Sequence, residues 1–252
     1  MDGGGADRWS AVADDWASYW GTFAEPVWGR LLQAAGVGPG TRVLDVGCGT
    51  GELLAHLSRR GAAATGVDPA AGMVARARRS APAAAVEVAG IEDLPFPDAS
   101  FDVVTLVNAL QFATDTFDAL AEVARVLVPG GAVAVANWAE GRRNDLDVVE
   151  RAVAAASDEE VRPDGDLRQP GGLEAVLTEA GLEPVTAGLV AAPWTAADDD
   201  MLVRGVLFGE DPGTIAELAD VVVRAAQPFR TAEGGYRLVN AFRFAVATTP
   251  AA

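Results

Sequence analysis

The sequence predicts an α/β fold with a doubly wound, mostly parallel sheet that helices cover on both faces. Between about residues 40 and 138, short apolar segments alternate with segments of helical periodicity, which is the order of strand–helix–strand units. The apolar segments lack a strict polar–apolar alternation, as expected of strands that are buried on both faces. With 252 residues, half of them apolar, the chain is long enough for one such domain.

The chain before this region is predicted to be mostly helical. The first five residues are expected to form a loose, glycine-rich tail. Apolar residues then recur every three or four positions from Trp9 to Trp20, which indicates one helical face. A second helix is predicted over residues 26–35, because the glycines and proline that follow it favour a stop.

The alternating region contains five predicted strands and three predicted helices. The strands are short, apolar and bounded by turn residues, and lie at 42–47, 62–68, 84–90, 101–108 and 132–138. The helices carry apolar residues at helical spacing and lie at 52–60, 71–79 and 116–128.

The second half of the chain is less regular. Helices are predicted at 146–156, 171–180, 196–207 and 212–226, and strands at 182–192 and 238–248. The absence of repeats indicates one domain over residues 1–252. We expect its core to comprise about 40–138, 171–192 and 238–248, and a helical lid to come from 1–36, 139–170 and 194–230.

Charge and composition exclude several classes of function. The formal net charge of −17 disfavours nucleic acid and anionic membrane surfaces as partners. No apolar run is long enough to span a membrane, and the start of the sequence does not resemble a signal peptide, so we expect a cytoplasmic protein. The single cysteine, Cys48, and the single histidine, His56, exclude an intramolecular disulfide, a cysteine zinc cluster and a two-histidine metal site.

A glycine-rich loop follows the first predicted core strand. Gly47, Gly49 and Gly51 read G-x-G-x-G, whereas a dinucleotide loop would require glycine at the position of Glu52. Asp68 ends the second predicted strand, where a carboxylate can accept hydrogen bonds from both hydroxyls of a ribose. The spacing therefore favours a nucleoside ligand without phosphates.

Four segments, VLDVGCGTG, GVDPAAGMV, EDLPFPDASFDVV and RVLVPGG, together resemble the motifs of class I S-adenosylmethionine-dependent methyltransferases of the bacterial small-molecule type. The resemblance covers about residues 40–138. It implies a Rossmann-like sheet of seven strands with the last one antiparallel, and S-adenosyl-L-methionine as cofactor, with S-adenosyl-L-homocysteine as product. It also implies transfer to an O, N or C atom of a small molecule, by a monomer or homodimer.

The resemblance also implies the cofactor contacts. Asp45 would orient the methionine amine, Asp68 would hold the ribose hydroxyls, and Asn108 would line the reaction centre. Two positions depart from the family pattern, since Gly90 stands where relatives often have aspartate and Trp16 where they often have tyrosine. The full expected set is Trp16, Tyr19, Asp45, Gly47, Cys48, Gly49, Gly51, Asp68, Pro69, Met73, Gly90, Ile91, Glu92 and Asn108.

The acceptor pocket is expected between the strand ends and the lid, lined by aromatic side chains. Arg204, within an apolar helical segment, would pair with an acidic acceptor or with a lid carboxylate. The candidates are Trp20, Phe23, Gln111, Phe112, Trp138, Trp194, Arg204, Leu207 and Phe208.

No catalytic base is identified from the sequence. His56 is interpreted as a helix-surface residue, and the carboxylate candidates, Asp14, Asp15 and Asp199, are each more typical of solvated charges. The fifth core strand ends without a carboxylate cluster, so no metal is predicted.

Two alternatives to methyl transfer remain at this point. Some relatives of this fold use the cofactor site to cyclise or rearrange natural products, and the scarcity of histidine adds to that alternative. A nicotinamide-dependent oxidoreductase is disfavoured by Glu52. The first hypothesis stays methyl transfer to a metabolite, in natural-product biosynthesis.

Overall fold

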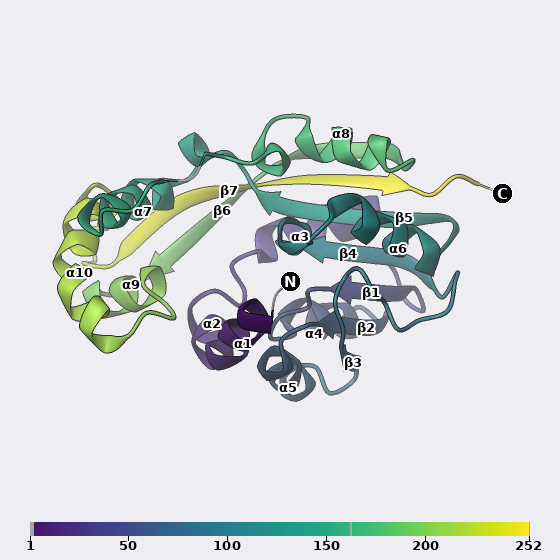
Figure 1. Cartoon of the computed structure of the whole chain (residues 1–252), viewed down its shortest axis with the longest axis horizontal. Helices are drawn as coiled ribbons and strands as arrows, with labels where there is room; N and C mark the ends of the chain where they lie inside the picture. Colours follow the sequence, from purple (N-terminus) through teal and green to yellow (C-terminus); the bar gives the residue numbers. More distant parts are fainter. Residues whose placement is uncertain (1–2, 162, 252) are drawn as a thin grey trace.

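A seven-stranded sheet runs through the molecule with helices on both faces, as seen in the computed structural model, which describes residues 3–161 and 163–251 (Figure 1). The strand order is β3-β2-β1-β4-β5-β7-β6. The strands are β1 (Arg42–Val46), β2 (Ala63–Asp68), β3 (Ala85–Val88), β4 (Phe101–Val107), β5 (Leu127–Trp138), β6 (Glu183–Ala196) and β7 (Tyr236–Thr248). The predicted doubly wound α/β fold is confirmed.

The direction of the strands also matches the expectation. β1 to β5 pair in parallel, while β7 is antiparallel to both β5 and β6. β1 lies between β2 and β4. The sheet therefore extends from β1 through β2 and β3 on one side, and from β4 through the later strands on the other. Ligands of open α/β sheets bind at such a switch point, outside the carboxyl ends of the strands.

The helices follow the predicted order. Most of their ends lie within about three residues of the expectation. They are α1 (Gly3–Ala11), α2 (Ala13–Tyr19), α3 (Glu25–Ala34), α4 (Glu52–Arg59), α5 (Ala71–Ser80), α6 (Thr116–Val126), α7 (Asp145–Ala156), α8 (Gly172–Glu179), α9 (Asp199–Val206) and α10 (Pro212–Ala225).

Three expectations about the elements were wrong. Of the five residues expected to form a loose tail, residues 1 and 2 lie outside the described residues and residues 3–5 belong to α1. This helix docks on α5, where the Ser10 hydroxyl accepts a hydrogen bond from the Gly72 amide. The helix expected from Trp9 to Trp20 is interrupted at Val12. The fifth strand begins at residue 127, since α6 passes directly into β5.

The two faces of the sheet carry separate apolar clusters. On β1, Val43 packs into the cluster that contains residues of α3 and α4, while Leu44 packs into the cluster formed with α6 and α8. Both side chains are fully buried. A strand buried on both faces has no polar face, which explains why the sequence of the core strands does not alternate.

The last two strands extend beyond the rest of the sheet. β7 pairs with β6 from Tyr236 to Thr248, but with β5 only from Phe242 onward. The remaining part forms a two-stranded ribbon that reaches α7, α9 and α10 (Figure 1). We call these three helices the lid. α3, although expected within the lid, packs against β5, β6 and β7.

The division of residues 1–252 into core and lid segments otherwise stays a prediction. No helix within residues 3–161 and 163–251 is long and apolar enough to cross a membrane.

Gly51→Ala is predicted to destabilise the fold by about 2–5 kcal/mol. Gly51 has a φ of 91°, and an added Cβ would lie 2.8 Å from the Ala77 Cα on α5. Gly36→Ala is the matched control, because Gly36 has a φ of 70° but no atom within 4 Å of an added Cβ. Chemical denaturation of both variants should show the larger loss for Gly51→Ala; equal losses would mean that the contact with α5 contributes nothing.

Candidate active site

A cavity of about 330 Å³ lies at the switch point of the sheet. Its floor is formed by the carboxyl ends of β1, β2, β4 and β5 and by the glycine loop, and its walls by α2, α7 and α9. The lining residues are Trp9, Trp16, Trp20, Gly21, Phe23, Ala24, Trp28, Asp45, Val46, Gly47, Cys48, Gly49, Thr50, Glu52, Leu53, Asp68, Pro69, Met73, Ala89, Ile91, Val107, Asn108, Ala109, Gln111, Phe112, Trp138, Leu146, Glu150, Gly205, Val206 and Phe208.

Asp68 fixes the glycine loop to the end of β2. One of its carboxylate oxygens accepts a hydrogen bond from the Gly49 amide at 3.0 Å, and the other accepts one from the Ala70 amide at 2.9 Å. Each oxygen keeps a second lone pair. Burial raises the pKa of Asp68. The carboxylate therefore lines the cavity with acceptor capacity still available for a ligand.

Asp45, at the end of β1, is a second buried carboxylate in the cavity wall. It is 3% exposed and accepts a hydrogen bond from the Thr105 hydroxyl at 2.7 Å. Burial raises the pKa of Asp45 to about 7, with further contributions from the nearby charges of Asp68 and Glu52. A positively charged ligand would favour its ionised form.

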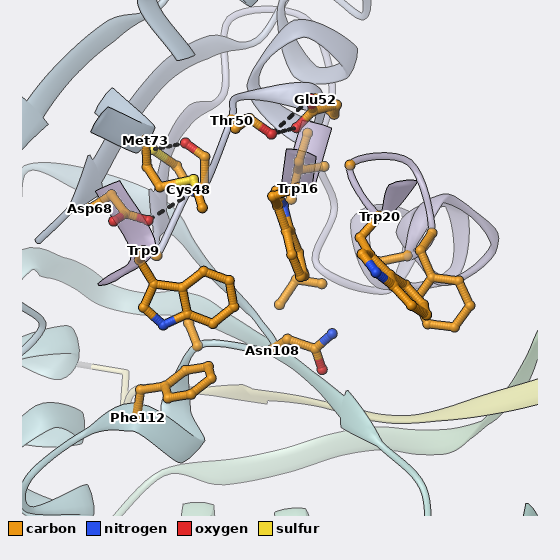
Figure 2. A pocket seen from close by; sticks show the side chains of 18 of the residues that line it. Trp9, Trp16, Trp20, Cys48, Thr50, Glu52, Asp68, Met73, Asn108 and Phe112 are labelled. Carbon is orange, nitrogen blue, oxygen red and sulfur yellow. Dashed lines mark hydrogen bonds between the residues drawn. The ribbon is translucent and has the colours of Figure 1, made fainter. Parts of the chain in front are cut away.

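The charged residues that line the described part of the cavity are all acidic: Asp45, Glu52, Asp68 and Glu150. Glu52 begins α4, and the Thr50 hydroxyl donates one hydrogen bond shared between its two carboxylate oxygens, at 2.7 and 2.9 Å (Figure 2). Because no arginine, lysine or histidine lies among these lining residues, the electrostatic field of the cavity favours a cation.

Asn108 presents an unsatisfied acceptor at the end of β4. Its backbone has a φ of 55°, a conformation that asparagine tolerates better than most residues. The side-chain Oδ1 is buried and has no hydrogen-bond partner among the described residues. An ammonium group of a ligand in the cavity would satisfy this oxygen.

Aromatic rings from three distant segments meet over the end of the cavity that the glycine loop and Asp68 line, which we call the cofactor end. Trp9 contacts Trp16 with ring centroids 5.3 Å apart, and Phe112 and Phe208 each at 5.9 Å. The rings come from α1, α2, the turn after β4 and the turn after α9. In Figure 2, Trp16 lies between Asp68 on one side and Trp20 on the other. We call Trp9, Trp16, Phe112 and Phe208 the aromatic cover.

A second aromatic group lines the opposite end of the cavity. Phe23 stacks on Trp138 with centroids 4.8 Å apart, and Trp20 lies 5.2 Å from Phe23. The Trp20 indole donates to the Gly205 carbonyl of α9 at 2.9 Å, which joins the N-terminal segment to the lid. We call this end the acceptor compartment.

Most of the residues expected from the sequence line the cavity. Of the expected cofactor residues these are Trp16, Asp45, Gly47, Cys48, Gly49, Asp68, Pro69, Met73, Ile91 and Asn108, and of the expected acceptor residues Trp20, Phe23, Gln111, Phe112, Trp138 and Phe208.

The other expected cofactor residues do not line it. Gly51 faces Ala77 of α5, so the third glycine allows two helices to approach rather than a ligand. Glu92 accepts a hydrogen bond from the Thr114 amide, and neither it nor Gly90 reaches the cavity lining. Tyr19 also lies outside the lining, where its carbonyl accepts from the Trp194 indole.

Three expected acceptor residues are structural instead. Trp194 is buried and stacks on Trp20 with centroids 4.7 Å apart. Arg204 is exposed on α9 and pairs with Asp200 at 2.9 Å. Of the two partners expected for Arg204, an acidic acceptor or a lid carboxylate, the structure contains the second. Leu207 is buried in the core cluster on that side of the sheet.

The carboxylates considered as bases also lie elsewhere. Asp14 pairs with Arg76 and Arg79, and Asp199 accepts from the Tyr236 hydroxyl. Asp15 is exposed outside the lining. His56 lies against Trp28 with ring centroids 5.4 Å apart, outside the cavity lining.

The sequence reasoning missed three functional candidates: Trp9, Glu52 and Glu150. Trp9 lies seven residues before Trp16, a helical spacing that placed both on one face. Glu150 lies four residues after Leu146 on α7, and both residues line the cavity. A helical-face argument applied to 146–156 would have pointed to Glu150, but only once Leu146 was known to face the site.

Residues 44–135 match the family model of the methyltransferase domain. The chain is 37% identical over 117 residues to a malonyl-[acyl-carrier protein] O-methyltransferase of Serratia marcescens, with 46% of each chain aligned. It is 34% identical over 183 residues to the 27-O-demethylrifamycin SV methyltransferase of Amycolatopsis mediterranei, covering 67% of this chain and 65% of that one. The chain thus spans about half the length of the first relative and about two thirds of the second.

The fold is similar to the crystal structure of a putative methyltransferase from Bacillus halodurans, with a TM-score of 0.61 at 20% identity, covering 88% of this chain and 98% of that one. The segment that matches the domain model is the same one that carries the glycine loop, Asp68 and Asn108. Residues 44–135 therefore form a methyltransferase domain of the class I S-adenosylmethionine-dependent type, whose cofactor is S-adenosylmethionine.

Proposed function

We propose that the chain is a cytoplasmic enzyme that transfers the methyl group of S-adenosylmethionine to an O, N or C atom of a small metabolite of natural-product type. The observation that carries this proposal is the lining of the cavity, where carboxylates are the only charged groups among the described residues. S-adenosylmethionine supplies a methyl group on a positively charged sulfonium, and its amino group adds a second positive charge. The acidic lining suits such a ligand.

The residues of the cofactor end have distinct proposed roles. The remaining lone pairs of Asp68 would accept hydrogen bonds from the ribose hydroxyls, and the orphaned Oδ1 of Asn108 would accept from the amino group. Asp45 would stabilise that amino group electrostatically. Met73 and Ile91 are buried apolar residues of the lining and would pack against the adenine.

The aromatic cover and the acceptor compartment would support the transfer itself. The rings of Trp9, Trp16, Phe112 and Phe208 would help to exclude water from the cofactor end, so that the nucleophile is not replaced by solvent. The acceptor compartment would hold the acceptor with its nucleophilic atom directed at the methyl group. The size and apolar walls of this compartment, together with the net charge of −17, support a small apolar acceptor over a nucleic acid.

Calorimetry with S-adenosylmethionine, S-adenosylhomocysteine and NAD tests the cofactor, and formation of S-adenosylhomocysteine with a panel of metabolites tests the reaction. We expect both adenosyl ligands to bind and NAD not to bind. Absence of binding of either adenosyl ligand would falsify the proposal. Conversion of an acceptor without release of S-adenosylhomocysteine would instead favour the cyclase or rearrangement alternative.

Asp68→Ala should weaken the affinity for S-adenosylhomocysteine by at least about 1–2 kcal/mol, because two hydrogen bonds to a charged acceptor are lost. Asp118→Ala, which removes an exposed carboxylate on α6, is the control and should leave the affinity unchanged. Calorimetric titration of both variants gives the comparison. Unchanged affinity in Asp68→Ala would show that Asp68 does not contact the cofactor.

Asp45 should make cofactor affinity depend on pH. Because its pKa is raised to about 7 in the free protein, the residue is largely neutral at pH 6 and ionises as the pH rises. The cation prefers the ionised form, so the affinity for S-adenosylmethionine should increase between pH 6 and 7.5. Asp45→Asn should flatten this part of the profile, as measured by calorimetry; an unchanged profile would show that the dependence does not come from Asp45.

The same residue should affect the stability of the free protein in the opposite direction. Its folded pKa lies above the ordinary value of 3.8, so the folded state binds the proton more tightly than the unfolded state does. The stability of the free protein should therefore decrease as the pH rises from about 4 to 7. Asp45→Asn should reduce this decrease in thermal unfolding without ligand, while the wild type should regain stability when the cofactor is added.

A further inference from the structure

A second cavity of about 210 Å³ adjoins the acceptor compartment. The two cavities share Gln111, Trp138, Leu146 and Glu150 in their linings, so these side chains form the boundary between them. The second cavity is the more polar of the two, since Asn144, Asp147 and Arg168 complete its lining. We call it the polar recess. A molecule held in the acceptor compartment can place a polar group against this boundary.

Glu150 is the side chain of this boundary that lacks a partner. No hydrogen bond or ion pair joins its carboxylate to any residue within 3–161 and 163–251. The neighbouring charges are already paired, Asp147 with Arg151 and Arg168 with Asp164. Arg168 also donates to the Ala139 carbonyl at 2.9 Å. No positively charged side chain among the described residues forms an ion pair with Glu150.

The surroundings of Glu150 disfavour its negative charge. The protein atoms around it raise its pKa through desolvation, and the charge of Asp147 raises it further, although Arg168 and Arg151 act in the opposite direction. Glu150 is nevertheless an exposed residue, and it lines both cavities. A ligand that brings a positive charge to this place would relieve the electrostatic cost of the carboxylate.

The aromatic side chains beside Glu150 suit the same kind of ligand. Trp138 lines both cavities and is stacked by Phe23 with centroids 4.8 Å apart, which leaves it fixed in position. Indole rings attract cations through their π-electrons, most strongly where water is excluded. The amide of Gln111, on the other side of the boundary, offers a further acceptor.

We propose that the acceptor carries a cationic nitrogen on an apolar body, and that Glu150 and Trp138 bind this group at the mouth of the polar recess while the body occupies the acceptor compartment. This inference rests on the proposed methyl transfer and narrows its substrate class. A protonated nitrogen has no free lone pair, so the methyl group is transferred to another atom of the acceptor. Glu150 is thus a specificity-determining residue and not the base of the reaction.

The experiment compares probes that differ in charge and little in shape, with S-adenosylhomocysteine present. Tryptamine provides the cation, 3-ethylindole the neutral apolar body and indole-3-propionate the anion. Affinities are measured by ligand-observed NMR or calorimetry. We expect tryptamine to bind about tenfold or more tightly than 3-ethylindole, and indole-3-propionate to bind most weakly.

Two charge-matched variants locate the effect. Glu150→Gln should abolish the preference for tryptamine and leave the affinity for 3-ethylindole unchanged, since it removes a charge with little change of shape. Glu179→Gln removes an equal charge from an exposed position on α8 and should preserve the preference. Glu179→Gln should also bind S-adenosylhomocysteine as the wild type does.

The outcomes separate this inference from the proposed function. Absence of S-adenosylhomocysteine binding to the wild type would remove the proposed function and this inference with it. Normal binding of S-adenosylhomocysteine, combined with equal or undetectable binding of tryptamine and 3-ethylindole, would overturn this inference alone. The same holds if Glu150→Gln keeps the preference, or if Glu179→Gln loses it to the same extent.

Discussion

The arrangement of the whole site depends on the two hydrogen bonds that the Asp68 carboxylate accepts from the Gly49 and Ala70 amides. They join the loop after β1 to the end of β2 and so determine where the glycine loop passes. The same loop brings Asp45 and Glu52 close enough for their charges to act on one another. The protein thereby keeps the Asp45 and Asp68 carboxylates in a buried place, which opposes their ionisation and raises the pKa of each. A cationic ligand offsets this cost, so the electrostatic strain of the free protein and its selectivity for a cation have one origin.

The acceptor side is constructed in a different way. β6 and β7 continue past β5, and the ribbon that they form carries the lid over the strand ends. The N-terminal helices occupy the space between the lid and α5, where the Trp20 indole binds the Gly205 carbonyl of α9 and α1 packs on α5 (Figure 1). Side chains separated by more than a hundred positions in the sequence therefore meet in one wall. The position of this wall relative to the glycine loop follows from the length of the ribbon.

This difference explains how much could be predicted from the sequence. The fold and the cofactor end depend on local patterns, namely strand periodicity, the glycine spacing and an aspartate at a strand end, and these led to Asp45, Asp68 and Asn108. Gly51 lies outside the cavity lining and faces Ala77, and a glycine needed for helix packing has the same sequence signature as one needed for a ligand. The acceptor wall depends on long-range packing, which the sequence does not specify. Trp194 was therefore taken for a pocket residue, and Glu150 was not recognised.

Side chains at the acceptor end can be substituted without altering the glycine loop or Asp68. The glycine loop, Asp68 and Asn108 lie in one continuous segment, the match to the methyltransferase domain at residues 44–135, whose backbone must keep its hydrogen bonds to hold the loop. Phe23 and Glu150 come from outside that segment, and α7 contacts the core mainly through the ribbon strand β7. A substitution at Glu150 alters the charge that faces the acceptor without touching the loop or Asp68. Under the proposed function, acceptor specificity would thus depend on side chains outside the segment 44–135 that holds the glycine loop and Asp68.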